Sequence, residues 1–336
     1  MSVDIDQLFL QFSKMKVAVI GDVMLDTYWW GNVERISPEA PVPVVAVSKR
    51  EQRIGGAGNV ALNVQALGAS VSLLTILGDD EDGYQLKKLL EEKNIDTRFI
   101  LESKKRITTN KIRIISRNQQ MMRLDAEIVH DIDDADEEKL QNQIEKFITT
   151  EKPDVVIFED YNKGILTKNI IANTISFCKK NNITTAVDPK RKNFFCYQHA
   201  TLFKPNLNEA ITGLNLLPEE ISSQLLSEIH SQLKEKLDHD ISLITLSEKG
   251  IFYQEENSKN ILPSHRRNIA DVSGAGDTVI AVASLIYAAT KDIGLAAKIA
   301  NIAGGIVCEE VGTVAINKEK LLQECKRLIS DFNPSF

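Results

Sequence analysis

Cysteine and histidine are scarce in this sequence, which has 4 Cys and 5 His among its 336 residues. The cysteines stand far apart, at Cys178, Cys196, Cys308 and Cys325. They form neither the close pairs of a zinc site nor the dense framework of a disulfide-rich domain. We therefore expect reduced, structural thiols in a cytoplasmic protein, and the scattered histidines predict no histidine metal site.

A basic start and a long apolar run are also absent. Residues 1–11 carry Asp4 and Asp6 in place of the positive charge that opens a signal peptide. The most apolar late stretches, 278–289 and 295–307, are too short to span a bilayer. We expect no export signal and no membrane partner.

Positive charge is in deficit, since the formal net charge at pH 7 is -7. Nucleic acids and anionic membranes bind strongly positive surfaces, so the overall charge argues against both as partners. An anionic small-molecule substrate would need a local basic pocket. Apolar residues make up 43% and charged residues 26%, a balance that excludes bulk disorder and suits a folded enzyme.

What the sequence does contain is a regular alternation of strand and helix patterns. A β-branched run at 16–20 is followed by a helical pattern at 56–67 and a second strand at 71–77. After a break the alternation resumes, and it ends in two apolar helical patterns at 274–289 and 293–308. This order predicts an α/β fold with a mostly parallel central sheet and helices on both faces.

Two stretches break this alternation. Residues 42–47 alternate in character beside two prolines, and residues 97–124 hold several short β-like runs with no helix between them. Prolines are tolerated at sheet edges, so we expect a small antiparallel β lid formed by about 27–50 and 97–125. No internal repeat or flexible linker is seen, which favours a single domain over residues 1–336.

A glycine turn carries the strongest chemical signal. Gly274, Ala275, Gly276 and Asp277 are followed at once by an apolar helical run, so they sit at the start of a helix. Unpaired N–H groups and the helix dipole make that position an anion site, which a phosphate can approach closely past small residues. Asp277 can then accept a proton from an attacking hydroxyl. The same residues are also ordinary helix-start chemistry, and taken alone they do not separate the two interpretations.

The glycine turn resembles the C-terminal signature of the ribokinase-like, or PfkB, carbohydrate kinases, which ends in Gly-Ala-Gly-Asp. Gly55, Gly56 and Asn59 open a helical pattern and match the family's sugar-binding diglycine motif. The likeness runs from about residue 16 to residue 316. It implies a ribokinase-like fold and an ATP-dependent kinase that uses Mg²⁺ and acts on a sugar.

On the sugar side, the resemblance assigns Asp26 to the acceptor. Residues 21–26 resemble the family's first-strand motif, whose last carboxylate binds sugar hydroxyls. A carboxylate with two oxygens suits neighbouring hydroxyls, and Asn59 adds both a donor and an acceptor. A solvent-facing turn aspartate is the alternative for Asp26.

On the nucleotide side, the resemblance marks the motif Asn-x-x-Glu at Asn206 and Glu209, with Glu209 meeting Mg²⁺ through water. The alternative is that both residues only cap the helix that follows. The remaining implied contacts are Ser247, Gly250, Gly276 and Asn301 for ATP, and Asp271 with the segment 311–313 for a monovalent cation such as K⁺.

A narrower resemblance, to the D-glycero-β-D-manno-heptose 7-phosphate kinases, rests on longer strings. They are the runs at 28–31, 35–44, 116–120, 123–125, 160–164 and 188–190. Basic residues at strand ends and in the predicted lid supply the pocket that a sugar phosphate needs. Solvated surface charge is the alternative for each of them. The candidates are Lys111, Arg113, Lys163 and Lys190.

The implied reaction transfers the γ-phosphoryl group of ATP to the anomeric hydroxyl of heptose 7-phosphate, giving the 1,7-bisphosphate for ADP-heptose and lipopolysaccharide inner core synthesis. A PfkB kinase for another sugar or sugar phosphate is the first alternative. A nicotinamide dehydrogenase would need a Gly-x-Gly-x-x-Gly loop after the first strand, and Gly21 with Asp22 does not provide one. A sugar-phosphate sensor without activity is the third.

Two further expectations concern assembly. Some members of the subgroup carry a fused nucleotidyltransferase domain with a His-x-Gly-His motif, and this motif is absent here, so we expect a kinase-only chain. Family members often form dimers through their lids. The aromatic run Tyr28, Trp29 and Trp30 is consistent with such a homodimer, and equally with a buried patch.

Overall fold

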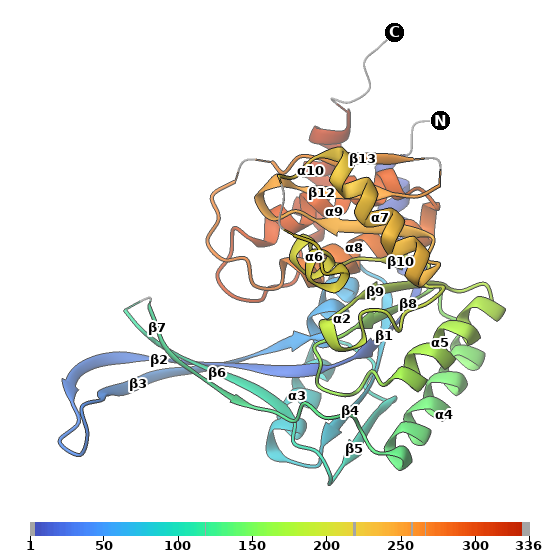
Figure 1. Cartoon of the computed structure of the whole chain (residues 1–336). Helices are drawn as coiled ribbons and strands as arrows, with labels where there is room; N and C mark the ends of the chain where they lie inside the picture. The colour runs from blue at the N-terminus through green and yellow to red at the C-terminus, as the bar shows by residue number, and fades with distance from the viewer. Residues whose placement is uncertain (1–3, 118, 218–219, 257, 266, 331–336) are drawn as a thin grey trace.

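The computed structural model describes residues 4–117, 119–217, 220–256, 258–265 and 267–330. The chain forms a body around one large sheet and an arm, a smaller sheet that projects from the body (Figure 1). The two sheets are built from different strands, so body and arm are described in turn.

Within the described residues the body sheet has nine strands, and its pairings are parallel except at one end. β11 pairs with β12 and β12 with β13 in antiparallel register, while the other neighbours run parallel. Across the sheet the strands are β13 (Lys259–Leu262), β12 (Ile251–Gln254), β11 (Ile241–Thr245), β10 (Leu202–Phe203), β9 (Thr184–Asp188), β8 (Val155–Glu159), β1 (Lys16–Gly21), β4 (Ser70–Gly78) and β5 (Ile100–Ser103). The predicted mostly parallel sheet is confirmed.

Successive side chains of a strand point to opposite faces of the sheet, so the central strands contribute side chains to two separate cores. In β1, Val17 and Val19 enter the first core, while Ala18 and Ile20 enter the second. Each fully buried branched side chain stabilises the fold by roughly 1.5–3 kcal/mol, so a one-residue slip of β1 would be strongly disfavoured.

Helices cover both faces of the body sheet, as predicted. Those of the first core are α1 (Ile5–Gln11), α2 (Ala57–Ala66), α3 (Glu81–Glu92), α8 (Ala275–Thr290), α9 (Ile293–Val307) and α10 (Lys318–Ser330), and those of the second are α4 (Asp134–Glu151), α5 (Lys168–Lys180), α6 (Leu207–Leu214) and α7 (Ser223–Leu237). Short 3₁₀ turns are η1 (Phe12–Lys14), η2 (Arg191–Asn193) and η3 (Ser247–Lys249). Among the described helices, none has both the length and the apolar character needed to cross a membrane.

The arm joins segments that are far apart in the sequence. Its strands, in spatial order, are β3 (Pro43–Gly56), β2 (Val23–Ile36), β6 (Thr109–Ser116) and β7 (Gln119–Ala126). β3 with β2 and β6 with β7 are antiparallel, as predicted, and Pro43 begins the edge strand β3. β2 and β6 pair in parallel, which an all-antiparallel lid does not allow. The chain crosses the body between β3 and β6, and this crossover lets it return in the same direction.

One segment of the predicted lid lies elsewhere. Ile100–Ser103 forms β5, which pairs in parallel with β4 at the edge of the body sheet. The range 27–50 lies within β2, β3 and their connection, whereas 97–125 supplies β6 and most of β7 to the arm. The arm is therefore built from a smaller part of the second range than expected.

Candidate active site

The carboxyl ends of the parallel strands form one edge of the body sheet. The chain runs outward from β1 to β4 and β5 on one side, and from β8 to β11 on the other. In open α/β sheets, such a reversal opens a crevice beyond the strand ends, and ligands bind there. Glu159 ends β8, Asp188 ends β9 and Asp22 follows β1 directly. Three acidic residues therefore stand at the crevice.

The predicted glycine turn lies at the start of α8. Gly274 is the N-cap residue, in a left-handed conformation with φ 78°, and Ala275 and Gly276 begin the helix. Asp277 follows in the first turn and is 4% exposed. The turn thus combines the first N–H groups of the helix, the positive end of a 16-residue helix and a buried carboxylate.

Two side chains from distant segments hold the Asp277 carboxylate. Asn59 Nδ2 donates to one oxygen at 2.8 Å, and the Tyr161 hydroxyl donates to the other at 2.9 Å. Burial raises the pKa of Asp277 above its usual value, the Asn59 hydrogen bond opposes this shift, and the charge of Asp188 adds to it. Asp277 is therefore a stronger proton acceptor than an exposed aspartate.

Three buried carboxylates and two lysines form a charged cluster beside the glycine turn. Oxygens of Glu159, Asp188 and Asp277 lie within 4.8 Å of one another. Lys204 Nζ is 2.7 Å and Lys190 Nζ 3.4 Å from the Asp188 carboxylate. Although burial opposes them, the two lysines hold the pKa of Asp188 below its usual value.

Glu159 differs from its two acidic neighbours. It is 0% exposed, and neither of its carboxylate oxygens has a hydrogen-bond partner in the described part of the chain. Burial, with the charges of Asp188 and Asp277, raises the pKa of Glu159 well above its usual value. Burial and the neighbouring negative charges therefore favour the protonated form of Glu159, while Lys190 and Lys204 both pair with Asp188.

A further buried aspartate shapes the loop that follows β8. Asp22 accepts hydrogen bonds from the backbone N–H groups of Tyr161 at 2.8 Å, Lys163 at 2.9 Å and Ile165 at 3.2 Å. These contacts tie the loop to the end of β1 and let Tyr161 reach Asp277. Sequence reasoning missed Asp22 and Tyr161 as site residues, although both stand just beyond a strand end, which is the available signal.

Asp26 lies on β2, in the half of the strand nearest the body. Its carboxylate is 2.5 Å from Arg113 Nη1 on the neighbouring strand β6. Gly55 lies on β3 at the other side, and a Cβ at that position would come within 2.4 Å of Asp26 Oδ2. Gly55 is therefore required for the close approach, and Gly56 follows as the N-cap residue of α2.

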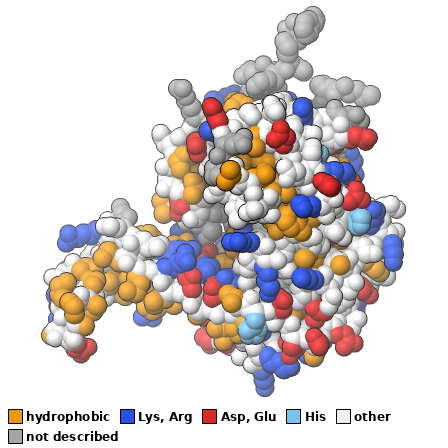
Figure 2. All heavy atoms as spheres, viewed as in Figure 1, with side chains coloured by type: hydrophobic (Ala, Val, Ile, Leu, Met, Phe, Trp, Pro, Cys, Tyr) orange, Lys and Arg blue, Asp and Glu red, His pale blue; other side chains and the backbone are white. Residues whose placement is uncertain are grey.

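Lys111 on β6 and Lys163 after β8 meet at a shared carboxylate. Glu127 Oε2 is 3.1 Å from Lys111 Nζ, and Glu127 Oε1 is 2.8 Å from Lys163 Nζ. Arg113 stands two residues beyond Lys111 and so projects from the same face of β6. Figure 2 shows Lys and Arg side chains gathered where the arm joins the body. We call Lys111, Arg113 and Lys163 the basic group.

Lys190, the fourth phosphate candidate, has different contacts. Its Nζ is 2.7 Å from Glu209 Oε1. Asn206 and Glu209 form a complete capping box at the start of α6, in which each side chain accepts from the other residue's backbone N–H. Both residues therefore cap α6. Glu209 has the Lys190 ion pair in addition, and this pair joins it to Asp188 at the crevice.

The other predicted nucleotide contacts are divided between two places. Ser247 begins η3 just beyond β11, and Gly250 closes that turn with φ 101°. Asn206 forms a β-bridge with Thr245, so Ser247 and Asn206 stand beyond neighbouring strand ends. Asn301 lies on α9, where its side chain donates to the carbonyl oxygen of Pro263 at 2.8 Å.

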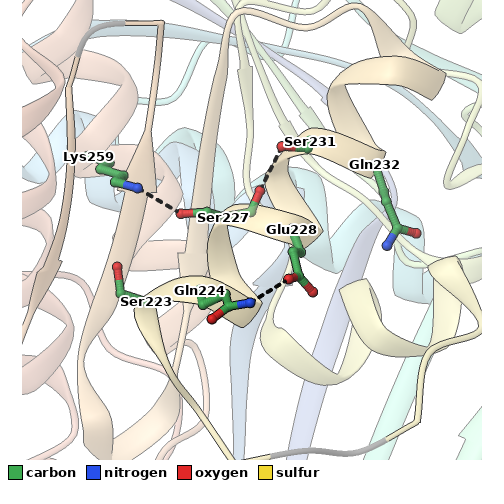
Figure 3. Close-up of a pocket in the computed structure, with 7 residues that line it drawn as sticks. All are labelled: Ser223, Gln224, Ser227, Glu228, Ser231, Gln232 and Lys259. Carbon is green, nitrogen blue, oxygen red and sulfur yellow. Dashed lines mark hydrogen bonds between the residues drawn. The ribbon is translucent and has the colours of Figure 1, made fainter.

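A separate hollow of about 640 Å³ lies between α7 and β13 (Figure 3). Its lining is Ser223, Gln224, Ser227, Glu228, Ser231, Gln232 and Lys259. These side chains are polar and partly bonded to one another, with Lys259 Nζ 3.3 Å from the Ser227 hydroxyl. No predicted site residue lines this hollow, and the candidate site is the crevice at the strand ends.

Solved structures of other proteins share this fold. Phosphofructokinase-2 from Escherichia coli, solved in complex with potassium, aligns with a TM-score of 0.78 at 16% identity, over 94% of this chain and 99% of that one. Arabidopsis thaliana ribokinase, complexed with ribose and ATP, aligns with a TM-score of 0.71 at 15% identity, over 92% and 99%. The class defined by this architecture is the ribokinase-like α/β fold, as predicted.

Sequence relatives give the family. Residues 14–320 match the profile of the pfkB family carbohydrate kinases. The bifunctional protein HldE of Sulfurimonas denitrificans is 41% identical over 90% of this chain, and that of Aliarcobacter butzleri is 39% identical over 92%. The chain spans 62% and 64% of the length of these two relatives. It belongs to the pfkB family of carbohydrate kinases and is an ATP-dependent sugar kinase.

Proposed function

We propose that the chain transfers the γ-phosphoryl group of ATP to the anomeric hydroxyl of D-glycero-β-D-manno-heptose 7-phosphate. The product is the 1,7-bisphosphate, which leads to ADP-heptose and the lipopolysaccharide inner core. The observation that carries the proposal is the basic group: Arg113 pairs with the sugar candidate Asp26, Lys111 lies opposite Asp26 in register, and Lys163 shares Glu127 with Lys111. The similarity to the bifunctional HldE proteins supports the heptose 7-phosphate kinase subgroup.

In this proposal the phosphoryl group is transferred at the amino end of α8. The N–H groups of Gly274, Ala275 and Gly276 bind the γ-phosphate oxygens. Asp277 accepts the proton of the anomeric hydroxyl as that oxygen bonds to phosphorus, and the bond from phosphorus to the ADP oxygen breaks. The raised pKa of Asp277 favours this proton transfer. Asn59 and Tyr161 hold the carboxylate oriented toward the acceptor.

Mg²⁺ fits the nucleotide end of the crevice by the chemistry of its side chains. Asp188 and Glu209 both present carboxylate oxygens around Lys190. Mg²⁺ prefers oxygen ligands and keeps several waters, so we assign these two carboxylates to contact it through water. When bound with ATP, the ion neutralises charge on the phosphates. Ser247, Gly250 and Asn301 remain our proposed nucleotide contacts.

At the acceptor end, we propose that the arm acts as a lid. Asp26 binds sugar hydroxyls, and Arg113 and Lys111 bind the 7-phosphate from β6 while Lys163 approaches from the body. These cations are now paired with Asp26, Asp125 and Glu127. A doubly charged phosphate would compete with those carboxylates for the same donors. Phosphate binding would thereby link the arm to the body.

A matched pair of substrates tests the acceptor. ADP release should be measured with heptose 7-phosphate and with the same heptose lacking its phosphate. Charge-assisted hydrogen bonds contribute about 1.5–3 kcal/mol each, so we expect kcat/KM to be at least about 100-fold higher with the phosphate. Other sugars and sugar phosphates complete the panel. Preference for an unphosphorylated hexose or ribose would refute the heptose assignment while leaving the kinase family intact.

We also propose that the chain forms a homodimer through the arm. Large apolar side chains are exposed there, including Ile36 at 61%, Val42 at 52% and Met122 at 54%. Figure 2 shows apolar side chains spread over the projecting arm, and patches of this kind mark association surfaces. Met122→Lys should lower the sedimentation coefficient toward that of a monomer. Leu217→Lys, at an exposed site of the body, is the matched control, and a monomeric wild-type chain would contradict the proposal.

A further inference from the structure

Arg53, on β3 of the arm, reaches into a loop near the C-terminal end of the described chain. Its Nη1 donates to the carbonyl oxygen of Val311 at 2.8 Å and to that of Thr313 at 3.4 Å. Its Nε forms an ion pair with Glu51 at 2.7 Å, and its guanidinium lies 5.0 Å from the centre of the Tyr28 ring. The side chain is 24% exposed, so these contacts hold most of it out of water.

The loop that Arg53 holds is bonded in turn to the glycine turn. The N–H of Gly312 donates to Asp271 Oδ2 at 2.9 Å. Asp271 Oδ1 accepts from the backbone N–H of Ser273 at 3.0 Å and from its hydroxyl at 2.8 Å. Ser273 directly precedes Gly274, the N-cap residue of α8. A short series of direct contacts therefore leads from the arm to the proposed phosphate site.

The backbone of the loop closes tightly around the guanidinium. Gly312 has φ +75°, and a Cβ at this position would lie 2.4 Å from Arg53 Nη1 and 3.2 Å from the Tyr28 hydroxyl. A larger residue would therefore be strained in its own conformation and would also displace Arg53. The backbone of the 311–313 loop therefore fits closely around the Arg53 guanidinium.

The same oxygens are those that the family resemblance assigns to a monovalent cation. Such an ion would need the Asp271 carboxylate and carbonyl oxygens of 311–313 as ligands. Here two of those carbonyls accept from Arg53, and both Asp271 oxygens accept from Ser273 and Gly312. The residues present do not fit an additional ion at these oxygens, because a fixed positive group already occupies them.

We propose that Arg53 replaces the monovalent cation in this kinase. The guanidinium supplies the positive charge that holds the 311–313 loop, and through Asp271 it positions the glycine turn. Because β3 belongs to the arm, this contact also couples the arm to the phosphate site. Arg53 is a positioning residue, and the enzyme needs no K⁺ for activity.

The first test compares cations at equal ionic strength. ADP release is measured with ATP as its Tris salt, Mg²⁺ and the best sugar of the substrate panel, in KCl or in tetramethylammonium chloride. The wild type should differ by less than about twofold between the two salts. Arg53→Gln loses the charged hydrogen bonds to the Val311 and Thr313 carbonyls, so its kcat should fall at least about tenfold. KCl should restore part of this loss in the variant, because K⁺ can enter the vacated oxygens.

Two readouts do not depend on the sugar or on turnover. The melting temperature of the wild type should be the same in the two salts, whereas that of Arg53→Gln should be higher in KCl. Thallium(I) soaked into crystals should bind near Val311 and Thr313 in the variant and be absent there in the wild type. Arg50→Gln, on the same strand, is the matched control and should behave as the wild type in all three measurements.

Three results would contradict the proposed role of Arg53. Activation of the wild type by K⁺, K⁺-specific stabilisation of the wild type, or thallium at the 311–313 carbonyls beside an intact Arg53 would each overturn it. If Arg53→Gln does not fold, Arg53→Lys provides the same comparison with the charge kept, and it should show no response to K⁺. A failure of the heptose assignment leaves the melting and thallium results unaffected.

Discussion

The body sheet and the arm sheet are both built from β-strands, yet their residues differ in exposure to solvent. In β4 of the body, every residue from Val71 to Gly78 is buried. In β7 of the arm, every residue from Gln119 to Ala126 is exposed. Helices cover the body sheet on both faces, so burial selects its side chains. Burial selects few of the side chains of β7, and elsewhere in the arm some side chains contact the body, as Arg53 does at Val311.

The two regions also hold their charges differently. In the body, Glu159, Asp188 and Asp277 are at most 4% exposed, and their pKa values are shifted by burial and by each other. In the arm, Lys111 and Arg113 have side chains that are 14% and 20% exposed and form ion pairs. The body suits proton and phosphoryl transfer, and the arm suits binding of an anionic acceptor. Variants of the basic group should therefore change mainly KM for the sugar phosphate, and variants of Asp277 mainly kcat.

The largest effect is expected from Asp277→Asn in the body. The amide keeps the size of the side chain but cannot take the proton of the acceptor, so kcat should fall by about 10²–10⁴-fold with little change in KM. Steady-state ADP release measures both constants. Asp134→Asn, in the first turn of α4, is the matched control and should match the wild type. A kcat within a few fold of the wild type would show that Asp277 is not the base.

Arg113→Gln tests the arm. Losing charged hydrogen bonds of about 1.5–3 kcal/mol should raise KM for the sugar phosphate by about 10–100-fold and leave kcat nearly unchanged. Arg123→Gln is the matched control, because Arg123 lies opposite Arg113 in register and has a side chain that is 51% exposed. A lower kcat with an unchanged KM would contradict the proposed role of Arg113 in binding the sugar phosphate.

We expect His239, a buried residue of the body, to make the folded protein less stable at acidic pH. Burial lowers the pKa of His239 from 6.5 to about 3, so between these values the unfolded chain binds the proton more readily. Stability is therefore full above pH 6.5 and falls as the pH drops toward 3. At pH 5 the loss from this group is about 2 kcal/mol. Urea unfolding at pH 7 and pH 5 should show a smaller loss in His239→Asn, and an equal loss would contradict the assignment.

The smallest effect is expected from Glu159→Gln, although Glu159 stands in the crevice. A protonated Glu and a Gln carry the same charge and nearly the same shape, so kcat should stay within about threefold of the wild type. Asp188→Asn is the comparison, because it leaves two lysines with less compensation and should cost about 3–5 kcal/mol of stability. Equal losses of activity and stability in the two variants would show that Glu159 is ionised. The assignment of charges within the cluster would then be wrong.

Long elements could be predicted from the sequence, and short or distant pairings could not. The helix expected at 56–67 is α2, and the strand expected at 71–77 lies within β4, since both contain enough periodic residues to show their type. β5 has only four residues, which are too few for the sequence to show which of the two sheets it joins. The parallel pairing of β2 with β6 depends on the crossover through the body.

The same limit applies to the site. Gly274 to Asp277 could be recognised as a helix start that binds an anion, because capping and dipole effects depend on residues next to one another. Asp22, Tyr161 and Glu159 were missed, since an acid or a tyrosine after a strand has many possible roles. Their contacts with the crevice come from the order of β1, β8 and β9 across the sheet.

The sequence by itself determined the α/β class, the glycine turn and the position of Asp277, since each follows from periodicity or from adjacent residues. Only the tertiary structure decided which side chains meet there. Asn59 reaches Asp277 across 218 residues of chain, and Arg53 reaches the Val311 carbonyl across 258. Such contacts, and the raised pKa of Glu159, depend on strand order and burial in the whole sheet, and these emerge only when distant segments pack together.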